Sequence, residues 1–155
     1  GNWDVSGVTD TRFMFNGASS FNQSLNSWDV SSVTIMIDMF RGASAFNGAI
    51  GNWNVSSVIN MQCVFKDCSV FNSAIDNWDV SSVTTMLSMF ENATSFNQPL
   101  NSWDVSSVTI MRSIFRSASA FNGAIDNWDV SSVTSTQGVF ENATSFNQPL
   151  NSWDV

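Results

Sequence analysis

Apolar and polar positions along the chain repeat with a period of 25 residues. Tryptophan marks the period most clearly, because it occurs seven times and always 25 residues apart, from Trp3 to Trp153. The surrounding pattern is N-x-W-D-V-S-S-V-T-x-M-x-x-M-F-x-x-A-x-x-F-N-x-x-L, without insertions. Periods of about 20 to 50 residues are typical of stacked structural repeats. We therefore expect residues 1–155 to be a single repeat array cut from a longer protein, with units 1–25, 26–50, 51–75, 76–100, 101–125, 126–150 and a partial unit 151–155.

The first part of each unit predicts a short β-strand. Trp28 and Val30 are two positions apart, so a strand would direct both side chains to the same side. Asp29 and its neighbours Ser27 and Ser31 would face the other side. The pattern L-x-x-W-x-V is also close to the L-x-x-L-x-L strand signature of leucine-rich repeats. The apolar side is therefore assigned to the core and the polar side to the surface.

The second part of each unit predicts a short helix. In the fourth repeat, apolar residues recur every three or four positions, at Val83, Met86, Met89 with Phe90, and Ala93. A turn should follow at the column Gly17, Gly42, Asp67, Asn92, Ser117 and Asn142, mostly residue types that tolerate a left-handed helix end. The predicted fold class is an α/β repeat solenoid, leucine-rich-repeat-like, with one short parallel strand plus one short helix per 25-residue coil.

Two sets of columns are predicted to be structural. The Met and Trp columns could form a cofactor slot or a sugar-stacking platform, but their spacing is that of core positions, so we assign them to packing. An asparagine follows the second phenylalanine of every full repeat. Stacked asparagines can hydrogen-bond backbone groups of neighbouring coils. The predicted structural ladder includes Asn47, Asn72, Asn97 and Asn122.

The net charge of −8 belongs to one side of the predicted coil. Eight acids and no base lie beside the tryptophans, and the remaining five acids and five bases cancel. Nucleic acid is not an expected partner, because phosphate binding needs clustered Lys and Arg. No apolar run is long enough for membrane insertion by this segment. The eight acids are Asp4, Asp29, Asp76, Asp79, Asp104, Asp126, Asp129 and Asp154.

A column of stacked aspartates repels itself and needs an offsetting interaction. One interpretation is structural: the D-x-S-S segment lets each Asp accept hydrogen bonds from the next turn's backbone or serine hydroxyls. The other is functional, with the column binding a basic patch of a partner or binding calcium through Asp79, Asp104 and Asp129. No dedicated calcium motif is present, and no other cofactor is expected. The candidate ligand-binding residues are Asp29, Asp79, Asp104, Asp129, Ser31, Ser81 and Ser106.

Charged and sulfur-containing residues elsewhere follow the repeat. The column Asn16, Arg41, Lys66, Glu91, Arg116, Glu141 places Glu91 between two bases and Arg116 between two acids, which predicts ion pairs between repeats. Cys68 occupies the core alanine position and is expected to be a small buried hydrophobe. A disulfide with Cys63 or a reactive thiol remains open.

The unit FNQPLNSWDVSSVTTMxxMFxxAxxFN resembles the 25-residue repeat of mycoplasma-type surface lipoproteins, which is often grouped with BspA-like leucine-rich repeats. The resemblance covers the whole chain. It implies a secreted or surface-displayed array, and BspA-like members are associated with adhesion to host matrix proteins and cells. It carries over no functional residue, because the shared motif consists of scaffold positions.

The leading functional hypothesis is a noncatalytic, surface-displayed adhesion module that contacts an extracellular protein or glycan through the acidic strand side. The alternative from another class is a structural spacer with no ligand of its own, and a third is ice or mineral binding through the threonine column. Exposed ends of the array could also associate end to end. An enzyme is not expected, because the chain has no His, no nucleophile elbow and no Gly-rich phosphate loop.

Overall fold

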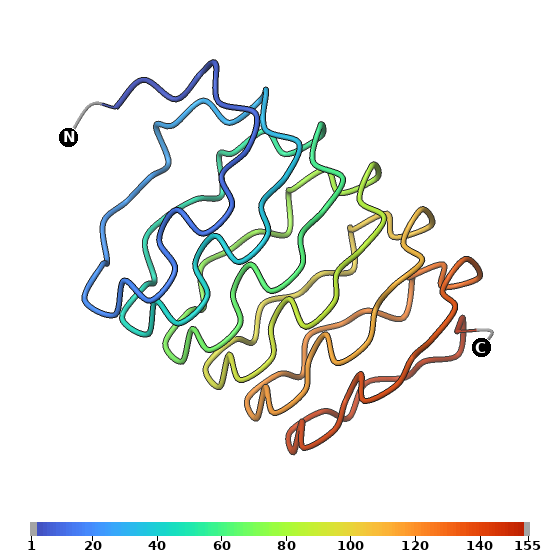
Figure 1. Ribbon diagram of the computed structural model, residues 1–155. Coiled ribbons are helices and arrows are strands. Elements are labelled where there is room, and N and C mark those ends of the chain that lie inside the picture. Colours follow the sequence, from blue (N-terminus) through green and yellow to red (C-terminus); the bar gives the residue numbers. More distant parts are fainter. Residues whose placement is uncertain (1–2, 154–155) are drawn as a thin grey trace.

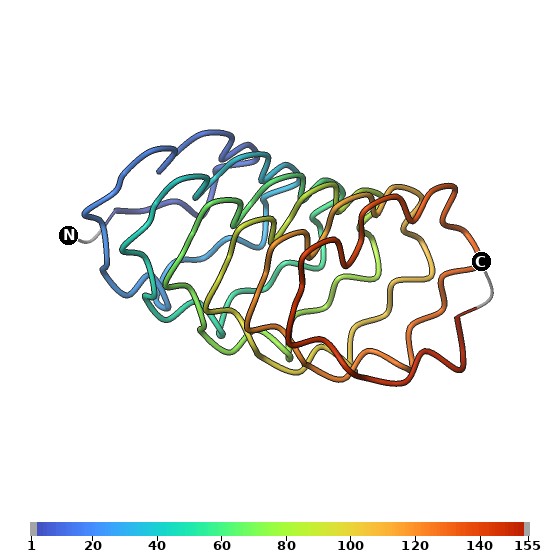
Figure 2. The ribbon, with the colours of Figure 1, turned by 90° about the horizontal axis from the view of Figure 1, so that it is seen from below.

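The backbone forms a stack of similar coils, one for each 25-residue repeat. The computed structural model describes residues 3–153, and the first and sixth coils form the two ends of the stack (Figures 1 and 2). We number the coils one to six, with coil one at residues 1–25 and coil six at 126–150. Hydrogen bonds join residues 24 or 25 positions apart, such as Thr34 N to Thr9 O at 2.8 Å and Phe40 N to Val64 O at 3.0 Å.

The predicted α/β solenoid with a helix in each repeat is wrong. Within residues 3–153 the chain forms neither a helix nor a continuous strand, and so contains no helix able to cross a membrane. Regular backbone pairing consists of isolated parallel bridges, which lie in the segment where the helix was expected and not at the Trp-x-Val segment. The leucine-rich-repeat assignment fails with the fold class. The bridges join Asp10 to Ile35, Ile35 to Asn60, Asn60 to Thr85 and Thr85 to Ile110.

The segment expected to be helical is a run of hydrogen-bonded turns. Phe40 N donates to Val64 O in the next coil at 3.0 Å, whereas Met39 N donates to Met36 O, three residues earlier, at 3.1 Å. The same alternation recurs along this segment of coils one, three, four and five, whereas coil six, at the end of the stack, keeps only the turn bonds. In an α-helix every N–H would bond the carbonyl four residues earlier. Here alternate N–H groups leave the coil, so the stack and not the segment itself completes the hydrogen bonding.

Left-handed residues explain why these turns cannot merge into a helix. Two columns, four positions apart, have φ between 53° and 70°. A positive φ at the third residue of a hydrogen-bonded turn is the mark of a type II turn, and a right-handed helix excludes it. The column expected to end a helix is thus left-handed, but it lies inside the run of turns. The first column is Phe13, Asp38, Cys63, Ser88, Ser113 and Gly138, and the second is Gly17, Gly42, Asp67, Asn92, Ser117 and Asn142.

Aromatic columns fill the core along the stack. Phe40 lies 4.2 Å from Phe46 in its own coil, measured between ring centroids, and 5.8 Å from Phe65 in the next coil. Trp53 and Trp78 stack at 6.1 Å with an angle of 7° between their rings. The methionines of coils two to five are fully buried beside them. The assignment of the Met and Trp columns to packing is confirmed.

Candidate functional site: the acidic face

Each aspartate that follows a tryptophan belongs to a tight turn on the outside of the stack. Asp79 Oδ1 accepts hydrogen bonds from Ser81 N at 3.1 Å and from Ser81 Oγ at 2.6 Å. Asp104 Oδ1 accepts the same bonds from Ser106, at 3.0 and 2.6 Å. These are the local side-chain to backbone bonds that Asp makes in Asx-turns. The D-x-S sequence therefore closes each turn within its own coil and does not need the next coil.

We define the acidic face as this series of turns, with its aspartates and the serines two positions later. The aspartates are exposed, and the predicted serines are half-buried and donate their hydroxyls to the carboxylates. No strand underlies the face, so the expected strand side is a surface of turns. Asp154 lies outside the described residues. All the candidate residues lie on the acidic face: Asp29, Asp79, Asp104, Asp129, Ser31, Ser81 and Ser106.

The serines lower the pKa of these carboxyl groups. The Ser106 hydroxyl, followed by the Ser106 N–H, holds the pKa of Asp104 below its ordinary value. Slight burial and the charges of Asp79 and Asp129 act in the opposite direction and raise it. The pKa of Asp79 is lowered in the same way by Ser81. The local hydrogen bonds thus outweigh the mutual repulsion of the column.

These shifts predict that the fold loses stability in acid. A carboxyl whose pKa is lower in the folded state stabilises the fold fully above its unfolded pKa, about 3.9 for Asp. That contribution is lost as the pH falls through the lower folded-state values. Urea unfolding between pH 7 and pH 2 should therefore show a midpoint that begins to fall near pH 4. The Asp79→Asn/Asp104→Asn variant should lose part of this dependence, and an identical profile would contradict the assignment.

The geometry does not support the calcium alternative. In the part of the chain that the structure describes, no three carboxylates or thiols come together in a group able to hold a metal ion. Asp79, Asp104 and Asp129 each belong to a different coil, and one oxygen of each already accepts hydrogen bonds from a serine of its own coil. Calcium usually takes six to eight oxygen ligands.

The asparagine column forms a hydrogen-bonded ladder along the stack. Asn47 Oδ1 accepts the N–H of Asn72 at 2.8 Å, and Asn72 Oδ1 accepts the N–H of Asn97 at 2.9 Å. Asn97 Oδ1 in turn accepts the N–H of Asn122 at 2.8 Å. Each side chain thus satisfies a backbone donor of the following coil, which is a structural role.

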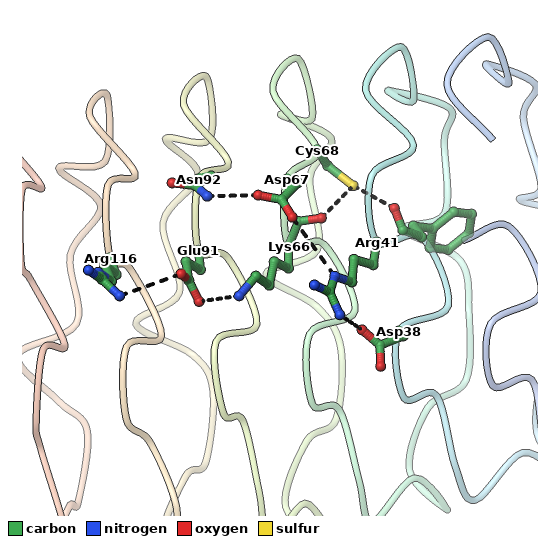
Figure 3. A network of polar contacts seen from close by, with 9 residues as sticks. Asp38, Arg41, Lys66, Asp67, Cys68, Glu91, Asn92 and Arg116 are labelled. Atoms are coloured by element: carbon green, nitrogen blue, oxygen red, sulfur yellow. Dashed lines mark hydrogen bonds and ion pairs between the residues drawn. The ribbon is translucent and has the colours of Figure 1, made fainter. Parts of the chain in front are cut away.

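A third side of the stack carries ion pairs between coils (Figure 3). Lys66 Nζ lies 2.8 Å from one carboxylate oxygen of Glu91, and Arg116 lies 3.8 Å from the other. Arg116 also lies 3.1 Å from Glu141. The predicted alternation of charges between repeats is confirmed. Because bases and acids pair here, the excess negative charge of the molecule belongs to the aspartates near the tryptophans, most of which lie on the acidic face.

The two cysteines are free and buried. Cys68 Sγ lies 2.9 Å from the carbonyl oxygen of Phe40 in the preceding coil (Figure 3). Burial, the largest effect, raises the pKa of Cys68 to about 12 and that of Cys63 to about 11. Cys68 is therefore a small buried side chain, as expected, and neither thiol has the lowered pKa of a reactive cysteine.

Two hollows lie at the ends of the stack, where the sequence predicted exposed ends. One, of about 430 Å³, is lined by Phe140, Leu150 and Trp153 among others. The other, of about 260 Å³, includes Trp3 and Phe15 in its lining. Their apolar lining comes from the columns that are buried in the middle coils. They are open surfaces of the core and share no residue with the acidic face.

Comparisons with known proteins identify a family without an assigned activity. The family model described as "Mycoplasma protein of unknown function, DUF285" matches twice, over residues 1–94 and 64–155. Together the two matches cover the whole chain. No curated protein and no solved structure matched.

Proposed function

Because the chain belongs to the Mycoplasma protein family of unknown function, DUF285, whose description names no activity, we propose its function from the acidic face. The protein is a noncatalytic binding module, and the acidic face contacts cationic groups of an extracellular protein or glycan. One observation carries the proposal: in the described coils, ionised carboxylates recur at the same exposed position of every coil except coil three, which has Asn54 there, and each is held in place by its own serine. Fixed side chains lose little conformational entropy when a partner binds.

The charge distribution supports recognition through complementary charge. Lys66 and Arg116 form ion pairs with Glu91 and Glu141 on the ion-pair side, so these bases do not neutralise the acidic face. A surface of one sign attracts an oppositely charged partner and raises the rate of association, most strongly at low salt. Binding through this face should therefore weaken as salt is added.

Display outside the cell is the second part of the proposal. The W-D-V-S-x-V-T-x-M-x-x-M-F pattern supports placing the chain with BspA-like surface repeats. Adhesion is the role associated with those repeats, and a repetitive surface of fixed charges suits it. The placement concerns surface display and repeat type and does not restore the leucine-rich fold.

The spacer and ice-binding alternatives have less support. A spacer would need only the ladders and ion pairs that run along the stack, and it leaves the uncompensated acidic face without a role. For ice binding, Thr84 Oγ1 and Thr109 Oγ1 already donate to Ile59 O and Thr84 O, at 3.1 and 3.2 Å. Ile59 also interrupts the threonine column.

The test removes charge from the acidic face without changing its turns. Asn54 occupies the Asp position in coil three, and its Oδ1 accepts the same bonds from Ser56 N and Ser56 Oγ, at 3.2 and 2.7 Å. Asp79→Asn/Asp104→Asn should therefore fold normally. In a screen against immobilised matrix proteins and glycans, we expect salt-sensitive binding that this variant weakens roughly 3- to 10-fold, as for the loss of two exposed charge pairs.

The control variant Asp67→Asn/Glu141→Gln removes the same charge on the ion-pair side. It should bind as the unchanged protein does. Equal loss of binding in both variants would mean that net charge alone matters, and the proposal for the acidic face would then fail. If no probe binds and both variants unfold normally, the spacer becomes the better assignment.

A further inference from the structure

Two glycines lie where one coil presses on the backbone of the coil before it. A Cβ added to Gly48 would overlap the carbonyl oxygen of Gln23 and lie 2.8 Å from its carbonyl carbon. A Cβ added to Gly123 would overlap the carbonyl oxygen of Gln98 and lie 3.1 Å from its carbonyl carbon. Because the nearest obstructing atom in each case is a backbone oxygen, a side-chain rotation cannot relieve either contact. Only glycine fits at these two positions.

The same repeat position accepts a side chain when the preceding coil differs. Ser73 follows Gly48 in the stack, and its hydroxyl donates to Gly48 O at 3.2 Å. Gln98 follows Ser73, and its Nε2 donates to Asn72 O at 3.0 Å. The repeat position therefore does not require glycine in itself. In both junctions with this close approach, a glycine coil follows a glutamine coil.

A second contact between coils occurs in the same two coils as the glycines. The coils that carry Gly48 and Gly123 begin with Asn-Ser, at Asn26 and Asn101. Asn26 Oδ1 accepts the N–H of Asn52 in the next coil at 2.7 Å. Asn101 Oδ1 accepts the N–H of Asn127 in the same way, at 3.0 Å. Coils two and five therefore share two contacts: a glycine against the backbone of the coil before them, and an asparagine side chain that accepts an N–H of the coil after them.

We infer that the Gln23–Gly48 and Gln98–Gly123 junctions determine which coil can stack on which, so that similar repeats are not interchangeable along the array. The Gln coil presents a carbonyl oxygen to the next coil, and the glycine leaves room for it. Coils two and five can replace each other, because both carry glycine and both begin with Asn-Ser. Coil three cannot replace coil two, because Ser73 would then face Gln23. The inference concerns the order of coils and does not depend on what the acidic face binds.

Two reordered chains of identical composition test the inference. In the first, residues 26–50 and 101–125 are exchanged, so each glutamine coil is still followed by a glycine coil. In the second, residues 26–50 and 51–75 are exchanged, so Ser73 is placed over Gln23. Both keep the order of charges on the ion-pair side, because the exchanged coils all carry a base there. Thermal unfolding would be followed by circular dichroism.

The first exchange should unfold at nearly the same temperature as the original chain. The second should unfold roughly 3–10 °C lower, as expected for forced overpacking in a domain of this size. A second exchange that fails to fold supports the inference only when the first exchange folds. If the two exchanged chains unfold at the same temperature, or if neither chain folds, the inference is overturned.

Single substitutions separate the steric contact from the general effect of replacing glycine. Gly7 has no atom within 4 Å of an added Cβ, so Gly7→Ala is the matched control. Gly48→Ala and Gly123→Ala should both lower the unfolding temperature relative to Gly7→Ala. The inference would also be overturned if all three alanine variants unfolded at the same temperature.

Discussion

Replacing Trp78 with alanine should lower the free energy of unfolding by about 3–5 kcal/mol, the range for a large buried aromatic residue. Trp78 is 2% exposed. Its ring stacks on Trp53 at 6.1 Å and lies 6.2 Å from Phe65. Its Nε1 donates to the carbonyl oxygen of Ile50, the last residue of coil two, at 3.2 Å. The substitution therefore opens a cavity and removes the hydrogen bond to a carbonyl in the interior.

Urea unfolding followed by circular dichroism would measure the effect, because the native and variant midpoints can be compared directly. Trp3→Ala is the matched control, since Trp3 has the same repeat position but is 61% exposed at the end of the stack. It should cost less than about 1 kcal/mol, as surface substitutions usually do. Equal losses at Trp78 and Trp3 would contradict the assignment of the column to the core.

The repeat columns that form the core and those that form the acidic face could be predicted from the sequence. The aromatic and methionine columns are buried, and the aspartates lie on the surface beside serines. Burial follows from the hydrophobicity of each position, which repeats in every coil. The ion pairs could be predicted because charges of opposite sign alternate in one column, as at Lys66, Glu91 and Arg116.

The backbone conformation could not be predicted from the apolar spacing. Met86, Met89 and Phe90 are spaced as on a helix, but that spacing only requires that the chain return to the core every three or four residues. Consecutive turns satisfy the same requirement. A helix this short gains little by itself, whereas Phe90 N and Asn92 N donate to the next coil at 2.9 Å. These partners are 24 residues away, so no single repeat contains the information.

The candidate site shows the same division between local and distant information. The bonds from Ser81 and Ser106 to their aspartates are local, and the D-x-S pattern indicated that type of bond. The expected donors were those of the next turn, whereas the structure has the serine two positions later in the same coil. Of the two left-handed columns, the sequence indicated only the one that contains Asn92. Ser88 and Asn92 are four positions apart, and two left-handed residues so placed exclude a helix.

A substitution in the asparagine ladder should have the second large effect on the free energy of unfolding. Asn72→Leu should lower the free energy of unfolding by about 1–3 kcal/mol, the cost of leaving polar groups without a partner. Asn72 Oδ1 accepts both the N–H of Asn97, at 2.9 Å, and the Nε2 of Gln98, at 3.0 Å. Leucine has similar size but no acceptor. Urea unfolding again provides the measurement.

Asn72→Asp is the matched control, because a carboxylate keeps the acceptor and nearly the same shape. It should retain most of the stability that Asn72→Leu loses, and equal losses would show that the acceptor is not what matters at this position. Coils in a stack contact mainly their neighbours, so weakening one junction reduces the cooperativity between the parts on either side. Asn72→Leu weakens the junction between coils three and four. Its unfolding curve should therefore broaden, whereas the curve of Asn72→Asp should remain as steep as that of the unchanged chain.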